Sequence, residues 1–173
     1  MSAHGVEIGL LILRVVTGLV WAGHGTQKLF GWFGAKGRGT LEDEFSHLGY
    51  QPPLLYGYLA GVTETGAGLA LAMGLVTPVA AGLLACVSVQ AMVVAKWPNG
   101  MWIQDDGCEY LVVLAALGIG LAFIGPGDLS LDAAFGIAFA GVTAGIVAAA
   151  AALATPLLPR RVGAAPLARE STE

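Results

Sequence analysis

The chain is poor in charge, in cysteine and in histidine. Only 12% of its 173 residues are Asp, Glu, Lys or Arg, about half the share found in soluble domains. The net charge of −4 offers no basic surface for a phosphate backbone, which excludes nucleic acid as a partner. The two cysteines form no Cys-x-x-Cys motif, and the three histidines form no pair four residues apart, so we expect no metal. No Walker or dinucleotide-binding loop is present, so we expect no nucleotide.

What the chain has in abundance is apolar residues. Hydrophobic residues make up 56% of the chain, and the mean hydropathy is +0.75. A surface with so few charges would not stay dispersed in water, so we expect a lipid bilayer to be its solvent. The composition therefore predicts an all-α fold, a polytopic bundle of transmembrane helices that forms one transmembrane domain over residues 1–154.

Intervals without charge predict five membrane spans, since about 20 apolar residues are needed to cross a bilayer. Two turn signals, Gly74–Pro78 and Gly125–Gly127, divide or end these intervals. The spans are expected at about 8–28, 54–73, 79–95, 109–124 and 133–154. The last one is rich in alanine, and a helix lying in the membrane interface is the alternative interpretation for it.

The segments outside the spans have expected structures of their own. In the loop at residues 29–53, Leu41, Phe45 and Leu48 share one helical face behind Thr40, which resembles an N-cap. This pattern predicts a short amphipathic helix on the cytoplasmic membrane surface. The tail at residues 155–173 contains three prolines and three arginines, and we expect it to be disordered.

The distribution of basic residues predicts an orientation. With five spans, seven of the eight Lys and Arg residues fall on one side of the membrane, and only Arg14 falls on the other. The positive-inside rule then places the loop at residues 29–53 and the C-terminus in the cytoplasm, and the N-terminus outside. With four spans, the eight Lys and Arg residues would divide evenly between the two sides of the membrane. The strong asymmetry obtained with five spans therefore favours five.

Polar residues within the spans form the candidate site. Ionisable groups are costly in hydrocarbon, so each one there is a hypothesis for function. Glu64 lies about ten residues into its span and would be either protonated or paired with a cation. His24 and Lys28 lie four residues apart on one helix face, and Gln90 and Glu109 are expected at a similar depth. We predict that these five residues converge, with Glu64 and His24 as catalytic groups and Lys28, Gln90 and Glu109 as ligand-binding groups.

Structural interpretations of the same residues stay open. Glu64 could form a buried hydrogen bond that only fixes helix packing, and Lys28 could extend to the lipid headgroups. Arg14 lies near the opposite end of the first span, where Asp128 and Asp132 are also expected. We interpret these three residues as a structural ion pair, Arg14 with one of the two carboxylates.

Several of these residues lie in motifs that resemble a known family. The motifs are Gly23-His24-Gly25-Thr26-Gln27-Lys28, Glu64, Glu109 and Gly125-Pro126-Gly127-Asp128-Leu129-Ser130-Leu131-Asp132. In this combination they resemble the DoxX family of small bacterial integral membrane proteins. The resemblance covers about residues 8–132 and implies a four-helix core in a bacterial plasma membrane, to which residues 133–154 would add a fifth helix. It also implies a redox association, because relatives are linked to quinone-coupled sulfur oxidation and to oxidative-stress complexes with partner enzymes.

Three hypotheses for function follow. In the first, the chain is a membrane subunit of a redox system that binds quinone and receives electrons from a partner protein, since no residue pattern here holds a flavin, haem or iron–sulfur cluster. In the second, the polar residues line the path of a small proton-coupled transporter. In the third, they only specify helix packing in a non-catalytic scaffold. A homo-oligomer is compatible with all three.

Overall fold

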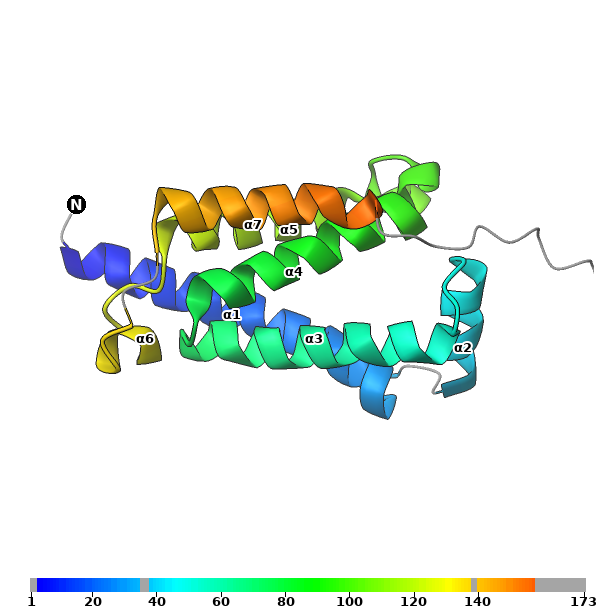
Figure 1. Ribbon diagram of the computed structural model, residues 1–173, viewed down its shortest axis with the longest axis horizontal. Helices are drawn as coiled ribbons and strands as arrows, with labels where there is room; N and C mark the ends of the chain where they lie inside the picture. The colour runs from blue at the N-terminus through cyan, green and yellow to red at the C-terminus, as the bar shows by residue number, and fades with distance from the viewer. Residues whose placement is uncertain (1–2, 35–37, 138–139, 158–173) are drawn as a thin grey trace, which may run out of the picture.

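The computed structural model describes residues 3–34, 38–137 and 140–157, and in these ranges the only regular secondary structure is helical. Five longer helices account for most of the fold, and two short helices lie between them (Figure 1). The longer helices are α1 (Ala3–Phe30), α3 (Pro53–Met73), α4 (Thr77–Ala91), α5 (Glu109–Ile124) and α7 (Val142–Ala154). The short ones are α2 (Arg38–His47) and α6 (Leu131–Ala134), and a π-helical turn, Met92–Lys96, extends α4.

The longer helices pack in chain order along one long axis. α1 packs on α3, α3 on α4, and α4 carries both α5 and α7 (Figure 1). The turn between α3 and α4 lies where the sequence predicts it, because Gly74 ends α3 with a left-handed backbone (φ 67°) that favours glycine. The bounds of α3 and α5 agree with the spans expected at 54–73 and 109–124 to within one residue.

Glycine allows α1 and α3 to approach closely. A Cβ atom built on Gly68 would lie 2.6 Å from the backbone nitrogen of Ala22 and 2.6 Å from the carbonyl oxygen of Gly18. Side chains at these positions would therefore push the two backbones apart. The large buried side chains of the core come from four helices, among them Trp21 of α1, Leu71 of α3, Leu84 of α4 and Leu121 of α5.

The predicted start of the fifth span at residue 133 is wrong. The chain forms only one turn of helix, α6, before Gly136 (φ 67°) and Gly141 (φ 104°), which adopt backbone conformations that interrupt a helix. The helix that follows, α7, begins at Val142 and has 13 residues. The tail predicted to be disordered begins with a 3₁₀ turn, Thr155–Leu157, and its remainder, 158–173, lies outside the described residues.

The amphipathic helix expected in the loop at 29–53 is present, and its apolar face packs on other parts of the chain. α2 begins at Arg38, before the expected cap at Thr40. Leu41 and Phe45 are buried against Tyr50, and Leu48, Ala60 and Val94 pack around them. The apolar face of α2 is thus covered by α3 and by the extension of α4, and it is not free to contact lipid.

The outer surfaces of the longer helices are strongly apolar. Two helices in the described residues, His4–Phe30 and Thr77–Asn99, are long and apolar enough to cross a membrane, and two shorter apolar helices cover Glu109–Ile124 and Val142–Leu157. Five exposed aromatic residues lie at or just after the end of α1 and after the extension of α4. These two segments lie at the end of the molecule where α2 is seen (Figure 1). The five residues are Phe30, Trp32, Phe33, Trp97 and Trp102.

Candidate functional site

An ion pair between Lys28 and Glu64 joins α1 to α3. The Lys28 Nζ atom lies 2.8 Å from Glu64 Oε1 and 2.6 Å from Oε2. Only 3% of the Glu64 side chain is exposed, against 23% of the Lys28 side chain. The Glu64 side chain is therefore buried between helices, whereas its partner Lys28 is partly exposed at the surface.

The positions of Lys28 and Glu64 depend on the small residues around them. A Cβ atom on Gly61 would lie 2.9 Å from Leu29 Cδ2 and 3.1 Å from Lys28 Cβ. One turn along α1, Gly25 faces Gly61 and Thr65 of α3. Because these glycines have no side chain, the last turns of α1 lie directly on α3, and Lys28 reaches Glu64 without an intervening water layer.

His24 lies one turn before Lys28 and joins α1 to α5. Its Nδ1 atom lies 3.2 Å from Gln27 Oε1, and its Nε2 atom lies 3.3 Å from the Tyr110 hydroxyl. The ring of Trp21 packs against the other side of the imidazole, at a centroid distance of 6.2 Å. We did not predict Tyr110 as a site residue. Its place in the first turn of an apolar helix, directly after Glu109, is the signal in the sequence that could have identified it.

Gln90 and Glu109 have hydrogen-bonding partners other than Lys28, Glu64 and His24. Gln90 donates a hydrogen bond from Nε2 to the Tyr50 hydroxyl, between α4 and the segment before α3. Glu109 accepts a hydrogen bond from the backbone N–H of Ile103 at 3.0 Å, in the loop before α5. The described hydrogen bonds therefore link Lys28 to Glu64 and His24 to Tyr110, and the convergence of all five residues stays a prediction.

At the opposite end, Arg14 ties α1 to the chain after α5, although not through an ion pair. The Arg14 side chain is buried (1% exposed) and donates from Nη2 to the carbonyl oxygen of Leu129 at 2.5 Å. The ion pairs within the described ranges include no direct pair between Arg14 and Asp128 or Asp132, while Asp132 and Glu7 lie close enough to attract the guanidinium group electrostatically.

The two aspartates at this end take part in hydrogen bonds between carboxylates and backbone N–H groups. Asp132 accepts hydrogen bonds from the N–H groups of Val76 and Thr77, at 2.7 and 2.8 Å. Through them it caps the first turn of α4, where four N–H groups have no partner within the helix. Asp128 donates its backbone N–H to Glu7 Oε2 at 2.5 Å. Backbone N–H groups in such a turn compete with Arg14 for the carboxylate of Asp132. The pattern of residue types in the sequence does not show this competition.

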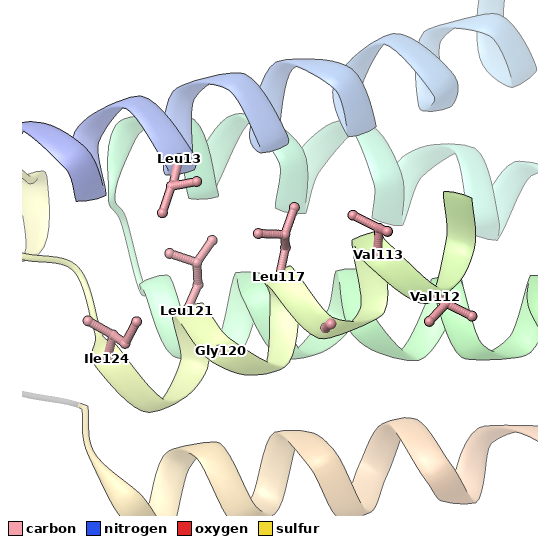
Figure 2. Close-up of a pocket in the computed structure, with 8 residues that line it drawn as sticks. Leu13, Val112, Val113, Leu117, Gly120, Leu121 and Ile124 are labelled. Carbon is pink, nitrogen blue, oxygen red and sulfur yellow. The ribbon is translucent and has the colours of Figure 1, made fainter. Parts of the chain in front are cut away.

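An apolar groove lies between α1 and α5. It has a volume of about 380 Å³, and Figure 2 shows Leu13 of α1 facing Leu117 and Leu121 of α5 across it. The remaining lining residues all come from α5: Val112, Val113, Ala116, Gly120 and Ile124. No charged or hydrogen-bonding side chain contributes to this lining.

The described residues contain no group of three or more His, Cys, Asp or Glu that could hold a metal ion. Cys86 and Cys108 are both free. The chemistry that the described side chains can offer is therefore acid–base and hydrogen-bonding chemistry, by Glu64, Lys28, His24 and Tyr110.

Comparisons with known proteins identify relatives of this chain. The family model DoxX matches residues 9–97. The protein named "Putative oxidoreductase CatD" from Bacillus subtilis (strain 168) is 30% identical over 126 residues, which is 73% of this chain and 86% of that protein. No solved structure matches the chain.

Proposed function

Since this chain belongs to the DoxX family, we propose that it is an integral membrane subunit of a quinone-linked redox system. In this proposal, the chain is a multi-pass protein of a bacterial plasma membrane. α1, α3, α4 with its extension, and α5 form the membrane core, and α7 adds a fifth crossing. The N-terminus faces outward, and α2 and the loop before α5 face the cytoplasm.

The apolar exterior supports this membrane arrangement. Along α1, Ile8, Ile12, Val16 and Leu19 are each more than half exposed. Such a continuous apolar face is unfavourable in water and favourable in lipid. The exposed aromatic residues near α2 fit the headgroup region, where Trp and Phe are commonly found.

The observation that carries the redox proposal is the Lys28–Glu64 ion pair inside this apolar layer. Removing two charges from water is costly, and a helix interface can be stabilised by apolar packing alone. Ionisable groups retained within a membrane bundle are functional candidates for this reason. The relative named as an oxidoreductase favours redox chemistry over transport.

Each polar side chain has a specific role in this proposal. Glu64 and His24 exchange protons with a quinone oxygen, as coupled proton and electron transfer requires. Lys28 holds Glu64 in its charged form until a proton arrives. Electrons come from a partner protein, because flavin, haem and iron–sulfur chemistry need cofactors that these side chains do not replace.

The proposal is tested by the quinone content of the purified protein. Lipids are extracted from the wild type and from Glu64→Gln, which keeps the shape of the side chain and removes its charge. We expect quinone in near-stoichiometric amount in the wild type and its loss in the variant, with equal helix content by circular dichroism. A wild type that contains no quinone and captures no redox enzyme would contradict the proposal.

A scaffold is the second candidate, and one observation favours it. Glu64, His24, Gln90 and Glu109 each have a hydrogen-bonding partner within the chain. A scaffold would therefore retain its cellular activity in Glu64→Gln, and a complementation assay with this variant separates the two candidates.

A further inference from the structure

A polar pair, His24 and Tyr110, lies one helical turn beyond one end of the groove between α1 and α5. Tyr110 lies one helical turn before Val113, which lines the groove, and α5 begins at Glu109. The His24 ring from α1 meets the Tyr110 ring at a centroid distance of 6.0 Å, and His24 Nε2 lies 3.3 Å from the hydroxyl. The face of α5 that lines the groove therefore continues, one turn beyond it, to a place where α1 and α5 share a polar contact among the described residues.

The groove exists because α1 and α5 are each packed closely on another helix. α1 is held against α3 by Gly18, Gly25 and Gly68. α5 is held against α4 at Gly118, where a Cβ atom would lie 2.8 Å from the carbonyl oxygen of Ala81. Neither helix can move toward the other without losing these contacts, so the space between them persists.

The polar end has unused hydrogen-bonding capacity. The indole Nε1 atom of Trp21 is buried and has no hydrogen-bonding partner among the described residues, and the Trp21 ring packs on His24. The Tyr110 hydroxyl can both donate and accept, and the tautomer of His24 decides which role it takes toward that imidazole. An additional carbonyl oxygen at this end would thus find a donor.

We propose that this groove binds an isoprenoid quinone, with the ring at His24 and Tyr110 and the tail along Leu117, Gly120 and Ile124. This inference rests on the proposed function and adds its binding site. The groove volume of about 380 Å³ falls within the range of pockets for small molecules. From Tyr110 to Ile124 the helix rises about 21 Å, which is enough for an extended tail.

The chemistry of the polar end favours a quinone over a phospholipid. A phospholipid headgroup carries a phosphate, which seeks free cations. Lys28, one turn from His24 on α1, is already bound to Glu64. His24 and Tyr110 instead offer groups suited to a neutral ring carbonyl. Val113 and Ile124 are more than half exposed on the outer side, so a lipid-soluble molecule can enter sideways from the bilayer.

A matched pair of glycine variants tests the groove. A Cβ atom on Gly120, which lines the groove, and one on Gly66, which lies on the exposed face of α3, would each have no neighbour within 4 Å. Gly120→Phe therefore fills the groove, and Gly66→Phe adds the same side chain elsewhere. Binding of decylubiquinone to the full chain in lipid nanodiscs is measured by quenching of tryptophan fluorescence. We expect Gly120→Phe to weaken binding about tenfold or more and Gly66→Phe to leave it unchanged.

A second probe and a second variant distinguish binding of the quinone tail from binding of the quinone ring. Duroquinone has the ring without the tail, so Gly120→Phe should weaken its binding much less than that of decylubiquinone. Tyr110→Phe removes one hydroxyl and should weaken both probes by about three- to tenfold, the loss expected for one hydrogen bond.

The possible outcomes distinguish the two proposals. If the wild type binds neither probe, the quinone-linked function itself fails. If the wild type binds decylubiquinone and Gly120→Phe binds it equally well, the function stands and the groove is not its site. Unchanged binding in Tyr110→Phe would likewise overturn the placement of the ring. If the groove holds only lipid, both Gly120→Phe and Tyr110→Phe should bind decylubiquinone as well as the wild type does.

Discussion

The Lys28–Glu64 pair is costly to bury, yet the proposed function needs both charged groups. If Glu64 alone is changed to leucine, the Lys28 ammonium group remains in a largely buried position without its partner. Breaking such a pair typically costs about 3 kcal/mol or more. We therefore expect Glu64→Leu to lower the free energy of unfolding by about that amount, measured by thermal unfolding in detergent micelles.

The double variant Lys28→Met with Glu64→Leu is the control for this prediction. It replaces the pair with apolar groups of similar volume, which is often neutral or stabilising. Recovery of stability without recovery of quinone binding would separate a functional pair from a structural one. If the double variant is as unstable as Glu64→Leu, then packing rather than charge explains the loss.

Gly74 gives a second prediction for a single residue. Its left-handed backbone (φ 67°) disfavours any side chain, and a Cβ atom there would collide with the Arg14 guanidinium group. Gly136 has the same φ of 67°, but a Cβ atom there would meet nothing within 4 Å. Backbone strain alone costs about 1 kcal/mol, so Gly136→Ala should lower stability by about that amount. Gly74→Ala should lower it clearly more, and equal losses would show that the Arg14 contact contributes little.

The sequence identified some of these residues and missed their partners for a physical reason. A buried carboxylate needs a cation, so Lys28 was a natural partner for Glu64. By contrast, the contacts of Gln90, Glu109 and Arg14 depend on helix rotation and on nearby backbone groups, which a pattern of residue types does not specify. Tyr110 was missed because an aromatic residue at a helix end has an equally good explanation in the membrane interface.

The packing of α1 on α3 predicts opposite effects for two neighbouring glycines. In an exposed helix interior, Gly→Ala stabilises by up to about 1 kcal/mol. Gly66 is exposed, so Gly66→Ala should follow this rule. Gly68 faces the backbone of α1 at 2.6 Å, so Gly68→Ala should instead destabilise by about 1–3 kcal/mol because the helices must separate. Thermal unfolding of both variants measures the difference, and two changes of the same sign would contradict this close approach.

Element boundaries were predictable where turn residues coincide with the end of an apolar run. Gly74 and Pro78 mark the turn between α3 and α4, and Gly125 follows α5 directly. The start of α7 was not predicted, because residues 133–141 are nearly as apolar as the helix and no charge interrupts them. Among the described residues between α6 and α7, Gly136 and Gly141 have positive φ angles, but isolated glycines are also common within membrane helices.

For the whole molecule, the longer helices alternate in direction. α1, α4 and α7 run in one direction and α3 and α5 in the other, so the described N-terminal end and the end of α7 lie at opposite ends of the molecule (Figure 1). The sequence could predict this alternation through its expected membrane spans, because consecutive crossings of a bilayer run in opposite directions. It could not predict that α1 and α5 would leave a groove between them, since that depends on how closely each packs on a third helix.

The proposed orientation in the membrane is testable with single cysteines in a variant that lacks Cys86 and Cys108. Asp128 is exposed near the turn after α5, and Asp105 is exposed in the loop before α5, at the opposite end of that helix. We expect a membrane-impermeant maleimide to label Asp128→Cys in intact cells and Asp105→Cys only after permeabilisation, because the basic residues keep the second end in the cytoplasm. The reverse pattern would invert the orientation, and labelling of both in intact cells would show that α5 does not cross the membrane.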